Sequence, residues 1–552
     1  RRADCCSDFI SRRARAGAAA PYTAHAAENP EINAWLVIEP DDTIIIRVAQ
    51  ADMRQGVLTS MPMPVAEELE VDWSRVRAEY ADPARHVQND GVYRRMQTGG
   101  NAAVRESREF LQLAGAEARE RLIKAAAELW LVNPEDCRAD YGEIHHDASG
   151  LSVNYGAITA AAANVRVANV KIKSSEDFGL LELPTPRLDV PAKVDGSAVY
   201  GIDVRLPGML YAAVRHAPVP GSEVRSLRFN AVCGMPGVVK AVRMQDAVAI
   251  VAEHYRQAKT ALDALPMQWT ASPDAKRHSE NFKREFVRGL DTDGVPVRRT
   301  GDAVRALDQS ETTLASDYVV PYLAHACMEP MNCTASVTES GVAVWAGVQN
   351  PETALSAAAR AAGVDASKVR MDNCFLGGGF GRRSHTDYIT EAVQIAREVN
   401  APVQMIRSRE EDMRRGRYRP MAAVRFKVGF DLDKNVTAFT NHSVSHSILE
   451  DANPEAVRGG VDPSSVEGLA NLPYDFPNLA ISHTMKRTHL TTWWWRSAGN
   501  SQNAYALECF MDELAVAAKR DPFDLRRAHL GAGPTCARCW ISCGNAQSGA
   551  AA

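Results

Sequence analysis

The sequence lacks the features that mark several classes of protein. No uncharged apolar run in its 552 residues approaches the ~20 residues that a membrane-spanning helix needs. Basic and acidic residues nearly balance, 63 against 68, and a net charge of −5 argues against binding to nucleic acid or to a membrane surface through a basic patch. A hydrophobic fraction of 45% and a charged fraction of 24% instead indicate a globular chain of several domains.

Cysteine is also scarce. Eleven cysteines are too few for a disulfide scaffold in a chain of this length, and those of the main body lack the ligand spacing of an iron–sulfur cluster. We expect six of them to be buried, reduced thiols. These six are Cys137, Cys233, Cys327, Cys333, Cys374 and Cys509.

Common catalytic motifs are missing as well. No Gly-x-Gly-x-x-Gly turn opens an early βαβ unit, which argues against a nucleotide-dependent dehydrogenase, and there is no Gly-x-Ser-x-Gly nucleophile turn. His325 and Glu329 would share one face of a helix, but the second His of a zinc-protease motif is absent. We therefore expect both to be buried groups with hydrogen-bond partners, and we predict no metal ion ligated directly by side chains.

The two ends differ from the chain between them. Residues 1–30 contain Ser11-Arg12-Arg13 and an alanine-rich stretch, which fit either a twin-arginine export leader or a disordered basic arm. The compartment is therefore left open between periplasm and cytoplasm. Residues 531–552 are rich in Gly, Ala, Ser and Cys, and their three cysteines are one ligand short of a closed zinc site. We expect a disordered tail that need not be native sequence.

Between these ends, strand-like and helix-like segments alternate, which predicts an α+β fold with at least three units. Apolar runs at 35–38 and 43–48 predict a hairpin, and helical spacing of apolar residues predicts helices at 63–69, 111–129 and 256–265, with another beginning at Pro134. Strands are expected at 211–214, 238–242, 247–251, 342–348 and 369–375. Alternating apolar residues from Val424 to Phe430 predict a strand with one buried face. The proline-rich stretch at 173–190 is expected to be a linker, and the polar stretch at 273–311 a second linker or a long excursion.

Three glycine-containing turns are candidates for ligand binding. The run Gly377-Gly378-Gly379-Phe380-Gly381 follows an expected strand and precedes an expected helix, so its backbone N–H groups suit an anion. It is not a Walker loop, because Arg382 and Arg383 follow it, and the pattern fits a purely structural turn equally well. Gln55-Gly56 and Thr98-Gly99-Gly100 are similar turns.

Several motifs occur together in a fixed order. They are Ala51 to Thr59 with Ala66 to Leu69, Pro191 to Gly196, His325 to Pro330, Gly377 to Gly381, Trp495 to Gln502, and Glu508 to Ala515 with Asp521-Pro522. As a set, over residues 33–530, they resemble the molybdopterin-binding large subunit of the xanthine oxidase family of molybdenum hydroxylases. The branch that the chain is most similar to holds isoquinoline 1-oxidoreductase beta subunits and related aldehyde-oxidising subunits.

The resemblance implies a fold and a set of cofactor-binding residues. A small α/β hammerhead domain at 191–272 would lie between molybdopterin-binding regions at 31–172 and 312–530. Gln349 would donate to the apical oxygen on molybdenum, Phe380 and Gly381 would line the metal, and the backbone around Arg496 would close the other side. The remaining cofactor-binding residues would be Gln55, Gly56, Thr98, Gly99, Gly100, Gly378 and Gly379. Trp494 and Trp495 would shape an aromatic substrate pocket, although packing alone also explains such indoles.

The resemblance also implies a reaction and a partner. The reaction is hydroxylation of a C–H bond in an N-heterocycle, such as an isoquinoline, or in an aldehyde, with water as the oxygen source. The cofactor would be molybdenum in a molybdopterin dinucleotide, with the cytosine form expected. Electrons would leave through [2Fe-2S] clusters on a separate small subunit, because this chain has no cysteine framework for them.

The sequence departs from the family pattern at three places. Arg54 replaces a glycine, which strains the backbone if a positive φ is needed there. Asn101-Ala102-Ala103 replaces a run of hydroxyl residues. The family's catalytic Glu belongs to a Gly-Val-Gly-Glu segment beyond the point matching Leu530, and no such segment follows here, so we expect a C-terminally truncated chain whose catalytic base is unknown. The alternative is a catalytically inactive fragment, unless another carboxylate such as Glu329 serves as base.

Overall fold

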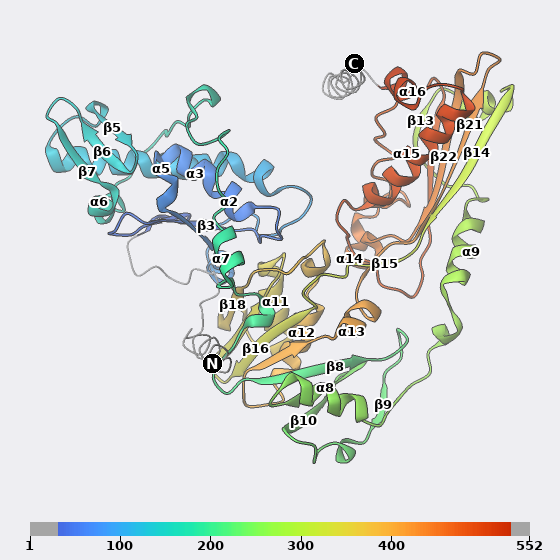
Figure 1. The fold of residues 1–552 in the computed structure, drawn as a ribbon, viewed down its shortest axis with the longest axis horizontal. Helices are drawn as coiled ribbons and strands as arrows, with labels where there is room; N and C mark the ends of the chain where they lie inside the picture. The colour runs from blue at the N-terminus through green and yellow to red at the C-terminus, as the bar shows by residue number, and fades with distance from the viewer. Residues whose placement is uncertain (1–30, 531–552) are drawn as a thin grey trace, which may run out of the picture. The chain divides into compact units, whose positions relative to one another are not determined.

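The protein is described by a computed structural model that covers residues 31–530, so the segments expected to be a leader and a tail lie outside the described residues. The chain forms two compact units (Figure 1). The first comprises residues 31–217, 223–270 and 326–413, and the second comprises 218–222, 271–325 and 414–530. Both mix helices and sheets, which confirms the α+β class. Within residues 31–530, no helix is both long and apolar enough to cross a membrane.

The first unit begins with a four-stranded sheet of order β1-β2-β3-β4 covered by helices. Its strands are β1 (Glu31–Asn33), β2 (Leu36–Ile38), β3 (Ile44–Val48) and β4 (Val76–Tyr80), and its helices are α2 (Val57–Ser60), α3 (Pro62–Leu69) and α5 (Ala103–Trp130). The short helix α4 (Pro83–Gln88) instead packs against α11 (Pro351–Ala362) and β18 (Val369–Asn373). The predicted hairpin is confirmed as the antiparallel pair β2–β3, and the two predicted helices as α3 and α5. A Cβ on Gly115 of α5 would lie 2.4 Å from the Val65 carbonyl oxygen, so glycine permits the close approach of α5 to α3.

The prediction of a helix beginning at Pro134 is wrong. Pro134–Asp136 forms one 3₁₀ turn, which the Asn133 side chain caps by accepting from the Glu135 N–H. A three-stranded antiparallel sheet follows, with β5 (Cys137–Asp140), β6 (Glu143–His146) and β7 (Leu151–Asn154), and then α6 (Tyr155–Ala162). Asn followed by Pro starts a 3₁₀ turn as well as an α-helix, and burial of Cys137 in the core decides for the strand.

The stretch 173–190, expected to be a linker, is tied to α3. The buried Glu67 carboxylate accepts hydrogen bonds from the backbone N–H groups of Gly179 at 3.0 Å, Leu180 at 2.6 Å and Leu181 at 2.9 Å. It also accepts from the Lys173 ammonium at 2.8 Å. The stretch therefore belongs structurally to the first unit, and it leads into α7 (Val190–Asp195).

A seven-stranded mixed sheet is the centre of the first unit. Its order is β10-β11-β8-β19-β16-β17-β18. The strands are β8 (Leu210–His216), β10 (Val238–Arg243), β11 (Ala247–Ala252), β16 (Asn332–Thr338), β17 (Gly341–Ala346), β18 (Val369–Asn373) and β19 (Val403–Ile406). Helices α8 (Tyr255–Ala264), α11 (Pro351–Ala362) and α12 (Asp387–Ala396) pack on it, and β9 (Val224–Leu227) pairs with β12 (Met267–Trp269). Because β8 pairs with β19, strands from the proposed hammerhead domain share a sheet with later strands, and its separation as a domain stays a prediction.

The second unit is built on a five-stranded sheet of order β13-β23-β22-β21-β14. The strands are β13 (Val295–Thr300), β14 (Thr312–Val320), β21 (Ala422–Phe430), β22 (Val436–Ser445) and β23 (Leu479–Met485); two short strands, β15 (Leu323–Ala324) and β20 (Tyr418–Arg419), pair apart from it. The long helix α15 (Gly499–Ala517) packs against β14 and β21 (Figure 1). The predicted alternation in β21 is confirmed, because Phe426 is fully buried and stacks on Phe510 at 4.8 Å between ring centroids.

The irregular linker expected at 273–311 is not found. That stretch holds α9 (Ser279–Gly289), β13 and α10 (Ala303–Asp308). Phe282 and Phe286, one helical turn apart, are both buried, and this short apolar repeat was hidden among charged residues. The remaining helices are α13 (Arg409–Arg414), α14 (Leu449–Ala452) and α16 (Pro522–His529).

The cysteine expectation is confirmed at four positions and wrong at two. Cys137, Cys327, Cys333 and Cys374 are free and buried, whereas Cys233 is exposed and Cys509 is half-buried. Burial raises the pKa of Cys333 and Cys374, so these thiols stay protonated.

We predict that Glu67→Ala detaches the stretch 173–190 from α3. The change leaves three backbone N–H groups without their acceptor and leaves Glu70 as the remaining partner of the Lys173 ammonium, and we expect it to cost about 3 kcal/mol in the free energy of unfolding. Urea unfolding and limited proteolysis measure this, and the stretch should become the first site of cleavage. The exposed Glu176→Ala is the control, and equal behaviour of the two variants would contradict the prediction.

Candidate functional site

The turn at residues 52–56 is closed by a buried aspartate. Asp52 accepts from the Arg54 N–H at 2.8 Å and from the Gly56 N–H at 3.0 Å, and its own N–H donates to the Tyr80 hydroxyl at 3.0 Å. Arg54 has φ of +80° and Gly56 has φ of +94°. The positive φ anticipated at Arg54 is confirmed, and a non-glycine residue there carries strain of about 1–2 kcal/mol.

A cluster of two buried carboxylates and two partly exposed cations supports this turn. Lys193 donates to both Asp52, at 3.2 Å, and Asp189, and Arg187 donates to Asp189 at 2.6 Å and to the Arg54 carbonyl at 3.2 Å. Burial alone would raise the pKa of Asp189, but the hydrogen bonds from Arg187 and Lys193 outweigh it and lower that pKa to about 2. Two cations therefore lie beside the turn that carries Gln55 and Gly56.

Gln349 and Thr98 join the turns to one another. The Ala51 N–H donates to the Thr98 hydroxyl at 2.7 Å, and the Thr98 N–H donates to the Gln349 carbonyl at 2.7 Å. The Gln349 side chain donates back to the Thr98 carbonyl at 3.1 Å. Turn 52–56, turn 98–100 and Gln349 thus meet within the first unit, although up to 300 residues of chain lie between them.

The glycine loop 377–381 lies against the same groups. The Gly381 N–H donates to the Gln349 side-chain oxygen at 3.0 Å. A Cβ on Gly379 would lie 2.5 Å from the Met53 sulfur and 2.6 Å from that same oxygen, so only glycine fits. Gly378, Phe380 and Gly381 have φ of +101°, +55° and +102°, and Phe380 holds this strained conformation with its side chain 38% exposed.

Backbone N–H groups of the loop are left for a ligand. Within residues 31–530, the N–H groups of Gly378, Gly379 and Phe380 donate to no protein acceptor, and Gly378 and Gly379 are buried. A buried N–H without an acceptor costs about 1–3 kcal/mol unless a ligand or water satisfies it. Consecutive N–H groups in such a turn form a concave site suited to an anionic oxygen.

Gln55 behaves differently from the other predicted residues. Its side chain folds back into its own turn, donating to the Ala51 carbonyl at 3.0 Å and accepting from the Met53 N–H at 2.5 Å. In turn 98–100, Gly99 is half-buried and Gly100 is exposed. The ligand-binding roles of all these residues stay predictions.

A chain of buried ion pairs follows the loop. Arg382 makes two hydrogen bonds of 2.8 Å to Asp387, and Arg407 donates to Asp387 at 3.0 Å and to Glu391 at 2.6 Å. Glu391 in turn meets His216 at 2.8 Å, and Glu411 meets the other ring nitrogen at 3.1 Å. Burial alone would lower the pKa of His216, but these two glutamates raise it to about 9. The chain links the glycine loop to α12, β19 and β8 with alternating charges.

Trp494, Trp495 and Arg496 belong to the second unit. His325 faces the Trp494 carbonyl at 2.8 Å and the Arg417 carbonyl at 3.1 Å, and the Arg419 guanidinium lies 5.7 Å from the Trp495 ring centroid. His325 and Glu329 do not share a helix, and both are buried with hydrogen-bond partners, as expected. Ser497 and Ala498 have positive φ, so the motif after the tryptophans is strained like the other two.

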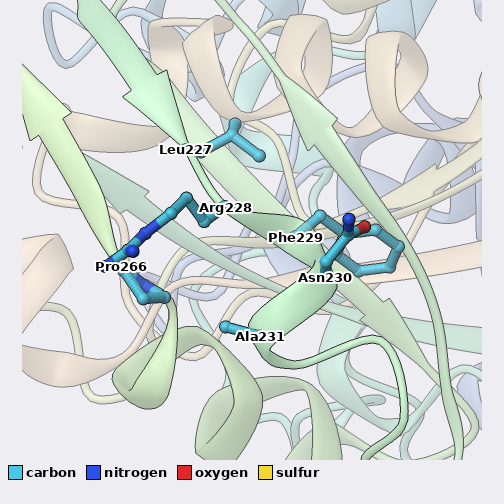
Figure 2. Close-up of a pocket in the computed structure, with 6 residues that line it drawn as sticks. All are labelled: Leu227, Arg228, Phe229, Asn230, Ala231 and Pro266. Carbon is cyan, nitrogen blue, oxygen red and sulfur yellow. The ribbon is translucent and has the colours of Figure 1, made fainter.

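Elsewhere in residues 31–530, two hollows are lined by none of the predicted site residues. Figure 2 shows a hollow lined by Leu227, Arg228, Phe229, Asn230, Ala231 and Pro266, none of which is a predicted site residue. Among the described residues, no three His, Cys, Asp or Glu side chains are grouped as a metal ion would require. The sequence missed the supporting residues Asp52, Lys193 and Arg383, whose only signal was their place inside the quoted motifs or directly after one.

Known proteins are similar to this chain in sequence and in fold. Two family models, each described as a molybdopterin cofactor-binding domain, match residues 10–192 and 290–530, which together exceed half of the chain. The beta chain of isoquinoline 1-oxidoreductase from Brevundimonas diminuta is 28% identical over 96% of this chain and 74% of its own length. The membrane-bound aldehyde dehydrogenase [pyrroloquinoline-quinone] of Gluconacetobacter polyoxogenes is 28% identical over 89% of this chain and 66% of its own.

Two further proteins are similar to this chain, one in sequence and one in fold. A nicotinate dehydrogenase subunit from Pseudomonas putida is 26% identical over 91% of this chain and 43% of its own length. The crystal structure of the aldehyde oxidoreductase from Desulfovibrio gigas has a TM-score of 0.51 at 18% identity, covering 63% of this chain and 43% of that one. The matched domains define the class, a molybdopterin-binding oxidoreductase subunit. The chain belongs to the xanthine oxidase family of molybdenum hydroxylases, as the motifs predicted.

We predict that Asp189→Asn lowers stability in a pH-dependent way. The folded-state pKa of Asp189 is about 2, below its usual value, so its stabilisation is fully present above about pH 4 and is lost as the pH falls toward 2. The variant should unfold more easily at pH 7, by about 1–2 kcal/mol, and its deficit should vanish near pH 2. Urea unfolding across pH 2–7 measures this, with the exposed Asp136→Asn as control. A deficit that does not depend on pH would contradict it.

Proposed function

We propose that this chain is the molybdenum-binding subunit of a hydroxylase that oxidises a C–H bond in an N-heterocycle or an aldehyde, with water as the oxygen source. The observation that carries the proposal is the meeting of turn 52–56, turn 98–100, Gln349 and loop 377–381 within one unit. Family membership gives this junction its meaning, because the resemblance assigns cofactor contacts to all four segments.

The residues at the junction fit a molybdopterin dinucleotide, for which we expect the cytosine form. The buried, unpaired N–H groups of Gly378 and Gly379 suit anionic oxygens, and the absence of a side chain at Gly379 allows a ligand to approach the backbone. Arg187 and Lys193 add positive charge beside turn 52–56. When bound, the cofactor supplies the redox-active molybdenum that accepts two electrons from the substrate.

This chain's own residues would position the cofactor and shape access to it. The Gln349 amide uses one hydrogen for the Thr98 carbonyl, and its second hydrogen is suited to donate to an oxygen of the cofactor. Its orientation is fixed, because the amide oxygen accepts from Gly381. The partly exposed Phe380 would exclude water beside the substrate. We further propose that Trp494 and Trp495 line the substrate pocket and that the backbone at Arg496 contacts the cofactor.

The partner and substrate follow from the relatives. Three of them carry names that mention isoquinoline, nicotinate or aldehyde oxidation. We propose the same two substrate classes for this protein, and a small [2Fe-2S] subunit as the acceptor of its electrons.

We predict that Gly379→Ala abolishes cofactor binding. The added Cβ would displace Met53 and the Gln349 amide, which also holds Gly381 and Thr98. The protein is produced with the maturation proteins of a molybdenum hydroxylase, and molybdenum is measured by mass spectrometry and the released nucleotide by chromatography. Wild-type protein should hold molybdenum and release cytidine monophosphate, and the variant should hold less than about a tenth as much.

The control is Gly234→Ala, since a Cβ there meets open space. It should bind the cofactor as the wild type does. Dye reduction by isoquinoline and by an aldehyde, with the iron–sulfur subunit present, then distinguishes the two substrate classes. Wild-type protein without molybdenum under these conditions would overturn the proposed function.

A further inference from the structure

We propose that Glu329 and Arg383 are positioning residues, a buried ion pair that holds loop 377–381 in its ligand-binding conformation. The inference rests on the proposed function for the loop's role, but the clamp itself is a matter of geometry. Neither residue is placed among the groups that contact the cofactor or the reacting atoms.

All the acceptor positions of the Glu329 carboxylate are used within the protein. One oxygen accepts from the Gly377 N–H at 2.8 Å and from Arg383 at 2.9 Å. The other accepts from the Ile202 N–H at 3.0 Å and from the Asn332 amide at 2.8 Å. A carboxylate offers about four lone-pair positions, so Glu329 is saturated and is not available as the catalytic base.

Arg383 binds the loop from its other side. Its guanidinium, fully buried, donates to the carbonyl of Gly378 at 2.8 Å, of Glu329 at 2.8 Å and of Gly347 at 3.2 Å. Its own carbonyl accepts from the Gln349 N–H at 2.9 Å. The side chain of Arg383 therefore ties the loop to Glu329 and to Gly347, and its backbone carbonyl holds Gln349.

The clamp explains how a strained loop persists. Phe380 with φ of +55° and the neighbouring left-handed glycines are stable only where the surrounding contacts determine the conformation. Glu329 holds the start of the loop at Gly377, Arg383 holds Gly378, and Gln349 holds its end at Gly381. The N–H groups of Gly378, Gly379 and Phe380, which lie between these anchors, have no acceptor within residues 31–530 and are available to a ligand.

Close packing adds a second constraint at the same place. A Cβ on Gly377 would lie 2.3 Å from the Glu329 Cβ, so the loop and the carboxylate side chain are in direct contact. Loss of the charge on Glu329 would leave a buried guanidinium unpaired, which typically costs much more than a lost neutral hydrogen bond. We therefore expect the loop to open locally rather than to shift as a rigid piece.

The test replaces each partner and measures the loop directly. Glu329→Gln keeps the shape of the side chain but points an amide NH₂ group at hydrogen-bond donors. Arg383→Lys keeps the positive charge but loses the planar guanidinium. Hydrogen–deuterium exchange of the peptide covering 375–384, in protein without cofactor, should become at least about tenfold faster in Glu329→Gln. Arg383→Lys should show a smaller increase. Molybdenum content of protein made with its maturation proteins should fall in the same order.

Glu31→Gln is the matched control, because it breaks another ion pair of the same unit, with the buried Arg47. It should lower stability and leave loop exchange and molybdenum content at wild-type values. The inference would be overturned if the loop peptide exchanged at the same rate in Glu329→Gln, in Arg383→Lys and in Glu31→Gln. Fast loop exchange in Glu329→Gln, together with wild-type protein that holds no molybdenum, would support the clamp and overturn the proposed function. If Glu329→Gln does not fold, Arg383→Lys against the same control decides.

Discussion

The buried amide of Gln349 is the contact on which the candidate site depends. Its nitrogen donates to Thr98, 251 residues away in sequence, and its oxygen accepts from Gly381, 32 residues away. An uncharged amide donates through its nitrogen and accepts through its oxygen in one plane, so a single residue can align two loops in a fixed relation. Because the amide is buried, losing either partner leaves an unsatisfied polar group, and both contacts are therefore maintained together.

Around that contact, the site combines local strain with strong anchoring. Non-glycine residues with positive φ occur at Arg54 and Phe380, each close to a glycine that also has positive φ. A buried carboxylate holds each of these two turns, Asp52 in one case and Glu329 in the other. It accepts hydrogen bonds from backbone N–H groups of the turn and pairs with a cation. The same physical arrangement thus occurs twice, and in both places the charge pair stabilises a turn that would not be stable alone.

The family comparison and the geometry support each other at different scales. Sequence similarity to the relatives is only 26–28%, and the chain spans from 43% to 74% of their lengths, so it identifies the family but does not fix a substrate. The geometry identifies which residues meet within the first unit. Trp494, Trp495 and Arg496 belong to the second unit, and their roles at the site are proposals.

The sequence by itself determined the family, the α+β class and most of the strongly periodic elements, such as α3, α5 and β21, because apolar spacing and motif order are local properties. The prediction failed at Pro134, because the residues that start a 3₁₀ turn look like those that start an α-helix. It also failed at α9, where a short apolar repeat is hidden among charged residues. Only the tertiary structure decided that Glu329 is a structural anchor, that the Gln55 side chain turns inward and that Thr98 meets Gln349. Those outcomes depend on which distant groups compete for each hydrogen bond, and sequence spacing carries no information about that competition.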